Sequence, residues 1–433
     1  MDVLLRDIGQ LVCITTDPEA THLAGPAMQT IEVLENAYLA IDDGKIHDFG
    51  KMDAPNSEVW ELSFSETYDC SNRIVLPGYV DSHTHLVFPT TREKEFQMRL
   101  KGKSYLEIAA EGGGILNSAK STAQMTEEDL FYSTLLRLEE IIRLGTTAVE
   151  IKSGYGLDPE AELKLLRAAQ RVKEFSPIPV RTTLLALHAL PEAYRTRRAE
   201  YISRVINELI PKVAEQDLAE YIDVFCEKGF FTVEESEQVL EAGKRHGLIP
   251  KVHANELDYS GGVQLAARVG ARSADHLECV GDAEIEALSG SEVMPTLLPA
   301  TAFFLGIEYA PARKMIDAGL PVALASDYNP GTSPSGNMNF VVAAACAQMK
   351  MLPEEALTAA CFNAAYALNW SREMGSIAVG KKANVLITEP AGHYSKIPYN
   401  FGRPIVEHIL IGGEKFEGLD LPAAWRERGE QLT

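Results

Sequence analysis

Short apolar runs recur along the middle of the chain, and each is separated from the next by a stretch with helical spacing. Eight of these runs have the length and β-branched content of strands, and they lie at 74–80, 146–151, 178–187, 221–225, 249–253, 272–276, 292–298 and 321–326. Between them, apolar positions recur every three or four residues, as at 127–145, 160–175 and 233–247. Apolar strands joined by helices are typical of a parallel sheet covered on both faces.

Two architectures contain parallel strands and helices in this alternation. Eight strand–helix units within about 250 residues match the count and span of a (β/α)8 barrel. The alternative is an open, doubly wound sheet, which usually carries a glycine-rich phosphate loop after its first strand. In this chain that position holds His83 and His85, so the sequence favours a TIM-like α/β barrel.

Both ends of the chain have a different, β-rich pattern. Residues 3–14 and 38–51 are predicted strands and turns, and Asp43-Gly44 is a hairpin signal within the second stretch. Stretches at 375–389 and 406–418 are also β-rich. We therefore predict a (β/α)8 barrel at 74–374 and a small β-sandwich domain built from both chain ends, at 1–73 and 375–433.

Composition and charge narrow the choice of partners. The chain has 433 residues, 46% of them hydrophobic and 24% charged, which is typical of a globular protein. Its formal net charge of −22 repels nucleic acid and anionic membranes, so we expect neither as a partner. A small anionic substrate would need a local cationic group to hold it.

The cysteines and the amino terminus indicate the cellular compartment of the protein. The six cysteines are scattered and form no C-x-x-C pair, which favours reduced thiols in the cytoplasm. The amino terminus lacks the basic region and long apolar core of a secretory signal peptide. No apolar run is long enough to span a membrane, so we expect a cytoplasmic protein.

Half of the ten histidines lie where predicted strands end. Barrel active sites form at these carboxyl ends, so the side chains there are expected to converge. One histidine in such a position is as often a core residue as a ligand. Five of them, joined by an aspartate and a glutamate, predict a metal site; the residues are His83, His85, His188, His253, His276, Asp327 and Glu256.

The residue types indicate which metal the site would hold. His83 and His85 are two residues apart and would project to the same side of an extended strand. With His253 and Asp327 they offer three nitrogens and one carboxylate oxygen, which suits one Zn²⁺ or Fe²⁺ with a position left for water.

Two acids and a histidine are candidates for proton transfer at this site. Glu256 follows His253 by three residues and could carry a proton from the water to a leaving nitrogen. The alternative is an ordinary solvated loop acid. Asp327 could instead be the first proton acceptor, and His276 could stabilise the developing oxyanion.

These motifs resemble the amidohydrolase superfamily and, within it, the imidazolonepropionase family. H-x-H and the late aspartate are shared across the superfamily, whereas R-E-K-E, K-S-G-Y-G and D-[FY]-N-P-G-[ST]-S are much narrower. The matching segments span most of the chain; they are VDSHTHLVFPTTREKEFQMRLKGKSYLEIAAEGGGI, GTTAVEIKSGYGLD, HANELDYSGG, SADHLE and SDYNPGTSP. The chain departs from the usual family pattern at Asn255, Tyr328 and Thr332, where the family often has Asp, Phe and Ser.

The resemblance implies an activity and a set of site residues. The reaction would be hydrolysis of the ring amide of 4-imidazolone-5-propanoate to N-formimidoyl-L-glutamate in L-histidine degradation, by a homodimer with one metal ion per chain. Its metal ligands would be His83, His85, His253 and Asp327. Its substrate contacts would be Arg92, Tyr155, His188, Glu256, Asn329, Gly331 and Thr332.

The chemistry of Arg92 and Tyr155 agrees with those implied contacts. Arg92 lies seven residues after His85, and its planar guanidinium can grip a carboxylate with two hydrogen bonds. The alternative is a surface arginine among neighbouring glutamates. Tyr155 lies between two glycines, where a sharp backbone bend could present its hydroxyl. The alternative there is an aromatic residue that only packs.

The later loops offer further polar groups. His188 follows an apolar strand and could polarise a ring carbonyl or bind a carboxylate. The Pro-Gly turn at 330–331 could expose backbone N–H groups beside Asp327. The triplet at 112–114 is glycine-rich but lacks the lysine of a phosphate loop, so we predict a mobile lid or substrate loop.

Other functions remain open at this level. An aminohydrolase that deaminates a heterocycle would use the same histidines, Glu256 and Asp327. Arg92 and the two glycine-containing loops favour the imidazolone reaction over deamination. A binding protein that has lost catalysis would usually lack ligands, and all four are present. Some members of the superfamily bridge two metals with a carboxylated lysine on the fourth strand. Lys152 ends the second predicted strand, so we expect one metal ion per chain.

Overall fold

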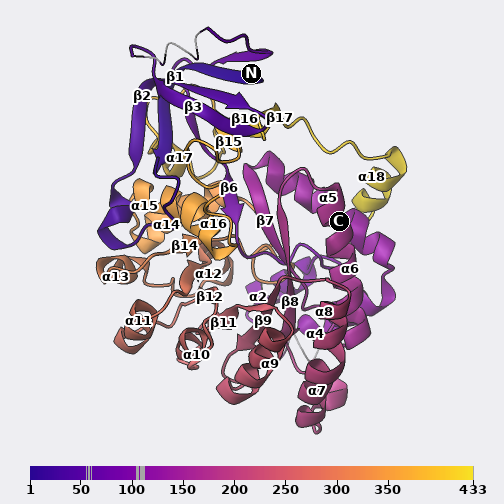
Figure 1. Ribbon diagram of the computed structural model, residues 1–433. Coiled ribbons are helices and arrows are strands. Elements are labelled where there is room, and N and C mark those ends of the chain that lie inside the picture. Colours follow the sequence, from indigo (N-terminus) through magenta and orange to yellow (C-terminus); the bar gives the residue numbers. More distant parts are fainter. Residues whose placement is uncertain (55, 57–58, 60, 104–106, 108–112, 433) are drawn as a thin grey trace.

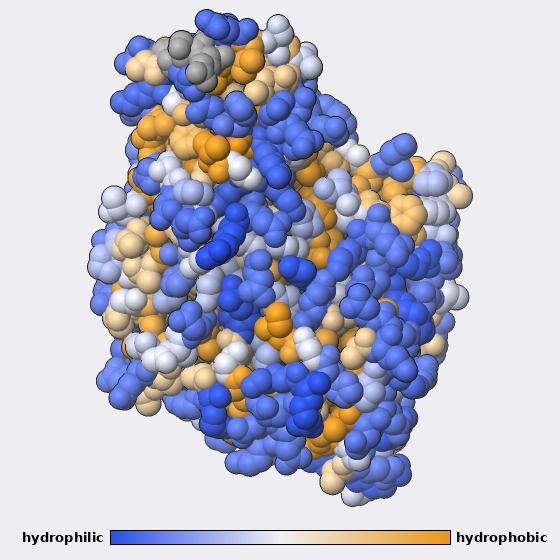
Figure 2. Space-filling view, viewed as in Figure 1, coloured by the Kyte–Doolittle hydropathy of each residue, from blue (hydrophilic) through white to orange (hydrophobic). Residues whose placement is uncertain are grey.

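The computed structural model describes residues 1–432, except 55, 57–58, 60, 104–106 and 108–112. Gly112, the first residue of the glycine triplet, therefore lies outside the described residues. The described chain forms a barrel of parallel strands with a separate mixed sheet beside it (Figure 1). Apolar side chains gather where these two parts meet, and the rest of the face in view is largely hydrophilic (Figure 2).

The barrel consists of parallel strands in sequence order, as predicted. Within the described residues, its strands are β6 (Tyr79–Asp81), β7 (Thr146–Lys152), β8 (Val180–Leu187), β9 (Tyr221–Cys226), β11 (Val252–Ala254), β12 (Ser273–His276), β13 (Met294–Leu297) and β14 (Ala323–Leu324), with a short β10 (Ile249–Pro250) beside β9. Most residues of these strands are buried, on both faces of the sheet, which explains the continuous apolar runs.

The barrel closes between β14 and the segment after β6. The Asp327 N–H donates to the carbonyl of His83 at 3.0 Å, and the His85 N–H donates to the carbonyl of Tyr328 at 2.8 Å. Thr84 and Tyr328 form a parallel bridge between these hydrogen bonds. The first and last barrel segments therefore meet at residues predicted to bind the metal.

Helices surround the barrel. They are α2 (Glu93–Leu100), α4 (Ile115–Gln124), α5 (Glu127–Arg143), α6 (Pro159–Phe175), α7 (Arg198–Arg204), α8 (Ile210–Glu215), α9 (Val233–Arg245), α10 (Gly262–Val269), α11 (Asp282–Ser289), α12 (Pro299–Leu305), α13 (Ala312–Asp317), α14 (Met338–Met349), α15 (Pro353–Thr358) and α16 (Ala364–Ala367). Local signals set several starts: Thr126 caps α5 by accepting from the Asp129 N–H at 3.0 Å. Thr232 and Glu235 form a capping box at α9.

The mixed sheet joins both chain ends. Its described strands are β1 (Val3–Ile14), β2 (Glu32–Asp42), β3 (Lys45–Lys51), β4 (Glu66–Asp69), β5 (Ile74–Pro77), β15 (Val385–Thr388), β16 (Val406–Ile411) and β17 (Glu414–Lys415). Strand β5 lies between β1 and β15, so it connects the amino-terminal and carboxy-terminal parts. The domain boundaries at 73/74 and 374/375 stay predictions.

The predicted first barrel strand, 74–80, was wrong in its extent. Residues Ile74–Pro77 form β5 of the mixed sheet, and only Tyr79–Asp81 enters the barrel as β6. Gly78 lies where the chain passes from the mixed sheet to the barrel. A larger residue would not fit there, because a Cβ would lie 2.2 Å from the Thr147 Oγ1 atom. The apolar pattern is continuous because both strands are buried.

The carboxy-terminal helix α18 (Ala423–Glu430) was not predicted. The chain leaves the mixed sheet after β17 and returns to pack α18 against α5 of the barrel (Figure 1). The Trp425 ring lies 5.5 Å from that of Phe131 and 5.4 Å from that of Phe175, measured between centroids. The helix is mostly polar, and besides Trp425 it is held by ion pairs of Arg426 with Glu139 and of Arg428 with Asp129. The sequence therefore shows no apolar stripe that would predict it. A one-turn helix, α17 (Lys396–Tyr399), precedes β16.

Lys381 gives a stability prediction for this part of the fold. Its buried ammonium group donates to the Ser371 carbonyl at 2.6 Å and to the Ser376 hydroxyl at 2.7 Å. Burial lowers its pKa from 10.5 to about 8. Between these values the unfolded chain binds more protons than the folded chain, so stability from this group rises with pH. We expect the melting-temperature advantage of the wild type over Lys381→Met to grow between pH 8 and pH 10. A difference independent of pH would contradict this assignment.

Candidate metal centre and substrate pocket

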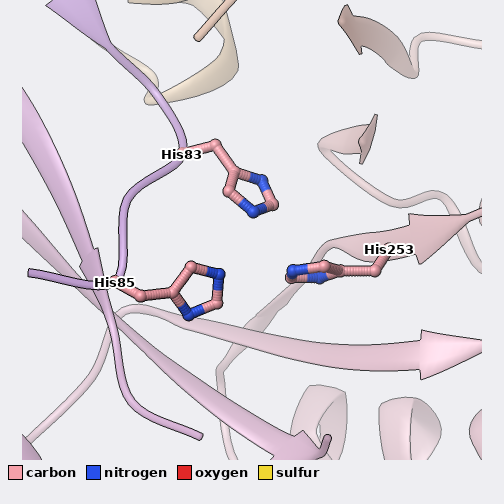
Figure 3. Close-up of side chains that lie close together, drawn as sticks. All are labelled: His83, His85 and His253. Carbon is pink, nitrogen blue, oxygen red and sulfur yellow. The ribbon is translucent and has the colours of Figure 1, made fainter. Parts of the chain in front are cut away.

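Three histidines converge at the carboxyl ends of the strands. His83 and His85 follow β6, and His253 lies on β11. One ring nitrogen of each lies within 4.8 Å of the others. Figure 3 shows the three rings around a common space, with nitrogens directed into it. The structure therefore brings together residues that are up to 170 positions apart in the sequence.

Asp327 completes the group from the opposite side of the barrel seam. Its Oδ1 atom lies 3.6 Å from His83 Nε2 and 3.5 Å from His85 Nε2. Its Oδ2 atom accepts a hydrogen bond from the Thr301 hydroxyl at 2.6 Å. The backbone of Asp327 is left-handed, with φ of 54°, a conformation that non-glycine residues adopt mainly where the surrounding structure enforces it. One carboxylate oxygen is thus held by Thr301 and the other faces the histidines.

The unsatisfied atoms of this group fit a divalent metal. His83 Nε2 and His85 Nδ1 are buried and have no hydrogen-bond partner among the described residues. Buried polar atoms normally have a partner, and His83 Nε2 instead lies 3.6 Å from Asp327 Oδ1. Burial, reinforced by neighbouring positive groups, holds the pKa of His83 and of His85 well below the usual value. Both rings are therefore neutral, which is the form that binds Zn²⁺ or Fe²⁺.

A buried network of charges lies next to the histidines. Lys152 Nζ is 2.7 Å from Asp223 Oδ2 and 3.1 Å from Glu150 Oε1. Lys251 Nζ is 2.6 Å from Glu150 Oε2. All of these side chains are fully buried. Lys152 is therefore engaged by two carboxylates, and the single metal ion per chain stays a prediction.

Asp223 of this network and the neighbouring Asp275 orient two of the candidate metal-site histidines. Asp275 Oδ2 lies 2.7 Å from His83 Nδ1, and Asp223 Oδ2 lies 2.9 Å from His253 Nδ1. A carboxylate on one ring nitrogen fixes the ring and leaves the other nitrogen for the metal. The sequence analysis missed Asp223 in this role. The available signal was a charged residue inside the apolar run 221–225.

Glu256 and His276 face each other at the rim of the site. Glu256 Oε2 is 3.8 Å from His276 Nδ1, and Glu278 Oε2 is also 3.8 Å from that atom. Burial raises the pKa of Glu256 to about 7, despite the opposing effect of His276. Burial opposes protonation of His276, but Glu256, Glu278 and Asp327 together raise its pKa to about 10. The site therefore holds a carboxylate that titrates near neutral pH beside an imidazolium ion.

A cavity of about 390 Å³ opens above the candidate metal centre. Six of the predicted substrate-contact residues line it: Arg92, Tyr155, His188, Glu256, Asn329 and Thr332. Gly331 lies directly behind the arginine, because a Cβ at this position would be 2.3 Å from Arg92 Nη1. Apolar side chains, including Phe225 and Phe230, line the remaining wall. The pocket thus combines the metal-site histidines, a cation and a flat apolar surface.

Arg92 is held in place by an acid that the sequence analysis treated only as its neighbour. Its Nε atom donates to Glu95 Oε2 at 2.9 Å, and its Nη2 atom contacts the same oxygen. Glu95 Oε1 also accepts from the Gly114 N–H at 3.0 Å. Glu95 thereby connects Arg92 to the start of α4, and Ile115 of that helix also lines the pocket.

His188 has a different hydrogen-bonding role from the one expected. Its Nδ1 atom lies 2.8 Å from the carbonyl oxygen of Gly154, which can only accept, so Nδ1 carries the proton. Burial, followed by the effect of His253, lowers the pKa of His188 to about 3. The ring is therefore neutral and Nε2 is an acceptor. Neither polarisation of a carbonyl nor binding of a carboxylate fits this state.

The loop after β14 also differs from the prediction. Asn329 Oδ1 accepts from the N–H groups of Gly331 and Thr332, both at 2.8 Å. Asn329 Nδ2 donates to the Thr332 hydroxyl at 2.7 Å. The predicted exposure of these two backbone N–H groups was wrong, because the asparagine side chain occupies them. Asn329 therefore shapes the loop beside Asp327.

The departures from the family pattern have structural partners. Asn255 has φ of 55°, a conformation that Asn and Asp adopt more readily than other side chains, and its Nδ2 atom donates to the Cys279 carbonyl at 3.0 Å. The additional hydroxyl of Tyr328 donates to Glu140 at 3.1 Å. At the third departure, the Thr332 hydroxyl accepts from Asn329 Nδ2 at 2.7 Å.

Comparison with known proteins places the chain in a family. The model of the amidohydrolase family matches residues 74–415. An imidazolonepropionase from Flavobacterium johnsoniae is 47% identical over 414 residues, covering 96% of this chain and 100% of that protein. One from Shouchella clausii is 44% identical over 411 residues, covering 95% of this chain and 92% of that protein. The chain belongs to the imidazolonepropionases of the amidohydrolase family.

Solved structures support the fold of this amidohydrolase. A zinc-bound adenosine deaminase from Xanthomonas campestris has a TM-score of 0.67 at 19% identity, covering 100% of this chain and 99% of that one. A 5-methylcytosine deaminase from Klebsiella pneumoniae has a TM-score of 0.71 at 18% identity, covering 97% and 98%. Among the described residues, no helix has the length and apolar character needed to cross a bilayer. The cytoplasmic location and the homodimer stay predictions.

Proposed function

We propose that this protein hydrolyses the ring amide C–N bond of 4-imidazolone-5-propanoate, giving N-formimidoyl-L-glutamate in L-histidine degradation. The observation that carries this proposal is the 47% identity to an imidazolonepropionase over 96% of the chain. The pocket supports it, because Arg92 and the histidine cluster line the same cavity. A small anionic ring with a propanoate arm matches this combination of groups.

The proposed metal is a single divalent ion, Zn²⁺ or Fe²⁺, held by His83, His85, His253 and Asp327. When bound, such an ion supplies a Lewis acid that lowers the pKa of a coordinated water. The buried acids Asp223 and Asp275 hold two of the histidine rings by their other nitrogens. Elemental analysis of the purified protein would measure the number and identity of bound ions, and two equivalents would contradict the proposed single site.

Glu256 is the proposed proton carrier. A pKa of about 7 allows it to accept a proton from the attacking water and to return one to the ring nitrogen as the C–N bond breaks. The water oxygen becomes part of the new carboxylate, and the nitrogen leaves with the returned proton. His276, held as an imidazolium ion by nearby carboxylates, stabilises negative charge on the former carbonyl oxygen.

The remaining polar groups bind the substrate. Arg92 pairs with the propanoate carboxylate, and it remains a cation within a pocket that also contains several acids. His188 Nε2 is an acceptor and accepts a hydrogen bond from a ring N–H group. The Tyr155 hydroxyl lies in the same cavity and is available to the substrate. These contacts orient the ring carbonyl toward the histidine cluster.

A substrate panel tests the proposed function. Purified protein, loaded with Zn²⁺ or Fe²⁺, would be incubated with 4-imidazolone-5-propanoate and separately with aminated heterocycles. We expect loss of the imidazolone absorbance without release of ammonia. Release of ammonia from an aminated ring, with the imidazolone unchanged, would support the deaminase alternative. Absence of both reactions in metal-loaded protein would reject catalysis of either kind.

Arg92→Lys tests the carboxylate contact. Lysine keeps the charge but cannot form two parallel hydrogen bonds, so we expect KM to rise about tenfold or more with a smaller change in kcat. Arg403→Lys is the control, since Arg403 forms an exposed pair with Glu389 at 2.6 Å. Steady-state kinetics on the imidazolone would measure both variants. An unchanged KM for Arg92→Lys would rule out the proposed contact.

A further inference from the structure

One buried carboxylate holds the loop that carries Tyr155. Glu162 lies on α6, and its side chain points back under that loop. Its Oε2 atom accepts from the Gly154 N–H at 2.8 Å, while Oε1 accepts from the Gly156 N–H at 2.6 Å and the Leu157 N–H at 2.7 Å. These donors lie on both sides of Tyr155. Only 2% of Glu162 is exposed, so these bonds are shielded from bulk solvent.

The loop adopts its bend around this carboxylate. Gly154 and Leu157 have φ of 115° and 58°, and the second value is uncommon for a leucine. A Cβ at Gly156 would lie 2.5 Å from the Glu162 nitrogen and 2.9 Å from its Oε1 atom. Successive N–H groups that point inward form a concave anion site, and here the anion is part of the protein. The strained conformation therefore depends on Glu162.

The same loop controls His188. The Gly154 residue donates its N–H to Glu162 and accepts the Nδ1 proton of His188 through its carbonyl. The ring centroids of Tyr155 and His188 are 5.2 Å apart, and both residues line the cavity. Glu162 is thus connected to two side chains of the pocket through one glycine.

We infer that Glu162 is a positioning residue, which holds the Tyr155 hydroxyl and the acceptor nitrogen of His188 toward the substrate. The inference rests on the proposed function, because it takes both side chains as substrate contacts. A carboxylate is required, since its two oxygens accept all three N–H groups. An amide at this position would turn its NH2 group toward at least one of those donors.

Glu162→Gln is the test, with Glu160→Gln as the matched control on the same helix. Glu160 is exposed and pairs with Lys212 at 2.6 Å. Turnover of the imidazolone would be measured per bound metal ion. We expect Glu162→Gln to lower kcat/KM at least tenfold with the metal content unchanged, and Glu160→Gln to stay within twofold of the wild type.

A double-mutant cycle with Tyr155→Phe separates positioning from general destabilisation. If Glu162 acts through Tyr155, the double variant loses no more than about twofold beyond the worse single variant. Effects that multiply, or a kcat/KM for Glu162→Gln within twofold of the wild type, would overturn the inference. If Glu162→Gln does not fold, Glu162→Asp keeps both acceptors on a shorter side chain, and the same cycle decides. An inactive wild type with bound metal would instead reject the proposed function.

Discussion

Glu256→Gln is expected to lower kcat by about 10²- to 10⁴-fold, the range typical of a lost general acid–base group. Glutamine has nearly the same shape but cannot take a proton from water or return one to the ring nitrogen. Burial raises the pKa of Glu256 to about 7, and the variant would lose this group that can exchange a proton near neutral pH. Single-turnover and steady-state kinetics on the imidazolone would measure the loss, and elemental analysis would show that the metal remains bound.

The control for this variant is Glu278→Gln. Glu278 also lies 3.8 Å from His276, but it does not line the cavity. We expect a much smaller loss of kcat there, because Glu278 affects only the charge state of His276 and Glu256 and transfers no proton itself. Full turnover by Glu256→Gln with metal bound would instead point to Asp327 as the proton acceptor.

Lys152→Met is expected to destabilise the folded protein by about 3–5 kcal/mol, as when one partner of a buried ion pair is removed. Methionine fills a similar volume, so the loss reflects charge and not packing. Without the ammonium group, Asp223 and Glu150 would lose their contacts at 2.7 and 3.1 Å and remain buried as anions. Urea unfolding of the metal-free wild type and variant would measure the difference.

Lys212→Met is the matched control for that loss. Lys212 also pairs with a glutamate, Glu160, at 2.6 Å, but both side chains are largely exposed. Exposed pairs contribute less than about 1 kcal/mol, so this variant should unfold close to the wild type. Equal losses from both variants would show that the buried network does not depend on the charge of Lys152.

The barrel and the candidate metal ligands could be predicted from the sequence because each has a local sequence pattern. Apolar β-branched runs mark buried parallel strands, and polar residues directly after them mark the active-site end. His83, His85, His253 and Asp327 occupy such positions, so their convergence follows once the barrel is recognised. The division of residues 74–80 between two sheets could not be predicted from the sequence, because both strands are buried and their apolar pattern is continuous.

The groups that orient the site could not be predicted in the same way. The roles of Asp223 and Glu162 depend on which atoms they meet, and those partners are distant in the sequence or belong to the backbone. The acceptor state of His188 likewise depends on one carbonyl, that of Gly154. A sequence shows that a polar residue is present but not which of its atoms is already occupied.

The closure of the barrel determines when the candidate metal ligands can come together during synthesis of the chain. The hydrogen bond from the Asp327 N–H to the His83 carbonyl joins the last strand region to the first, so the four candidate ligands come together only when the barrel is closed. During synthesis, His83 and His85 emerge about 240 residues before Asp327. Binding of a metal by all four candidate ligands would therefore follow translation of most of the chain. A product truncated before Asp327 would hold the three candidate histidine ligands without the candidate carboxylate.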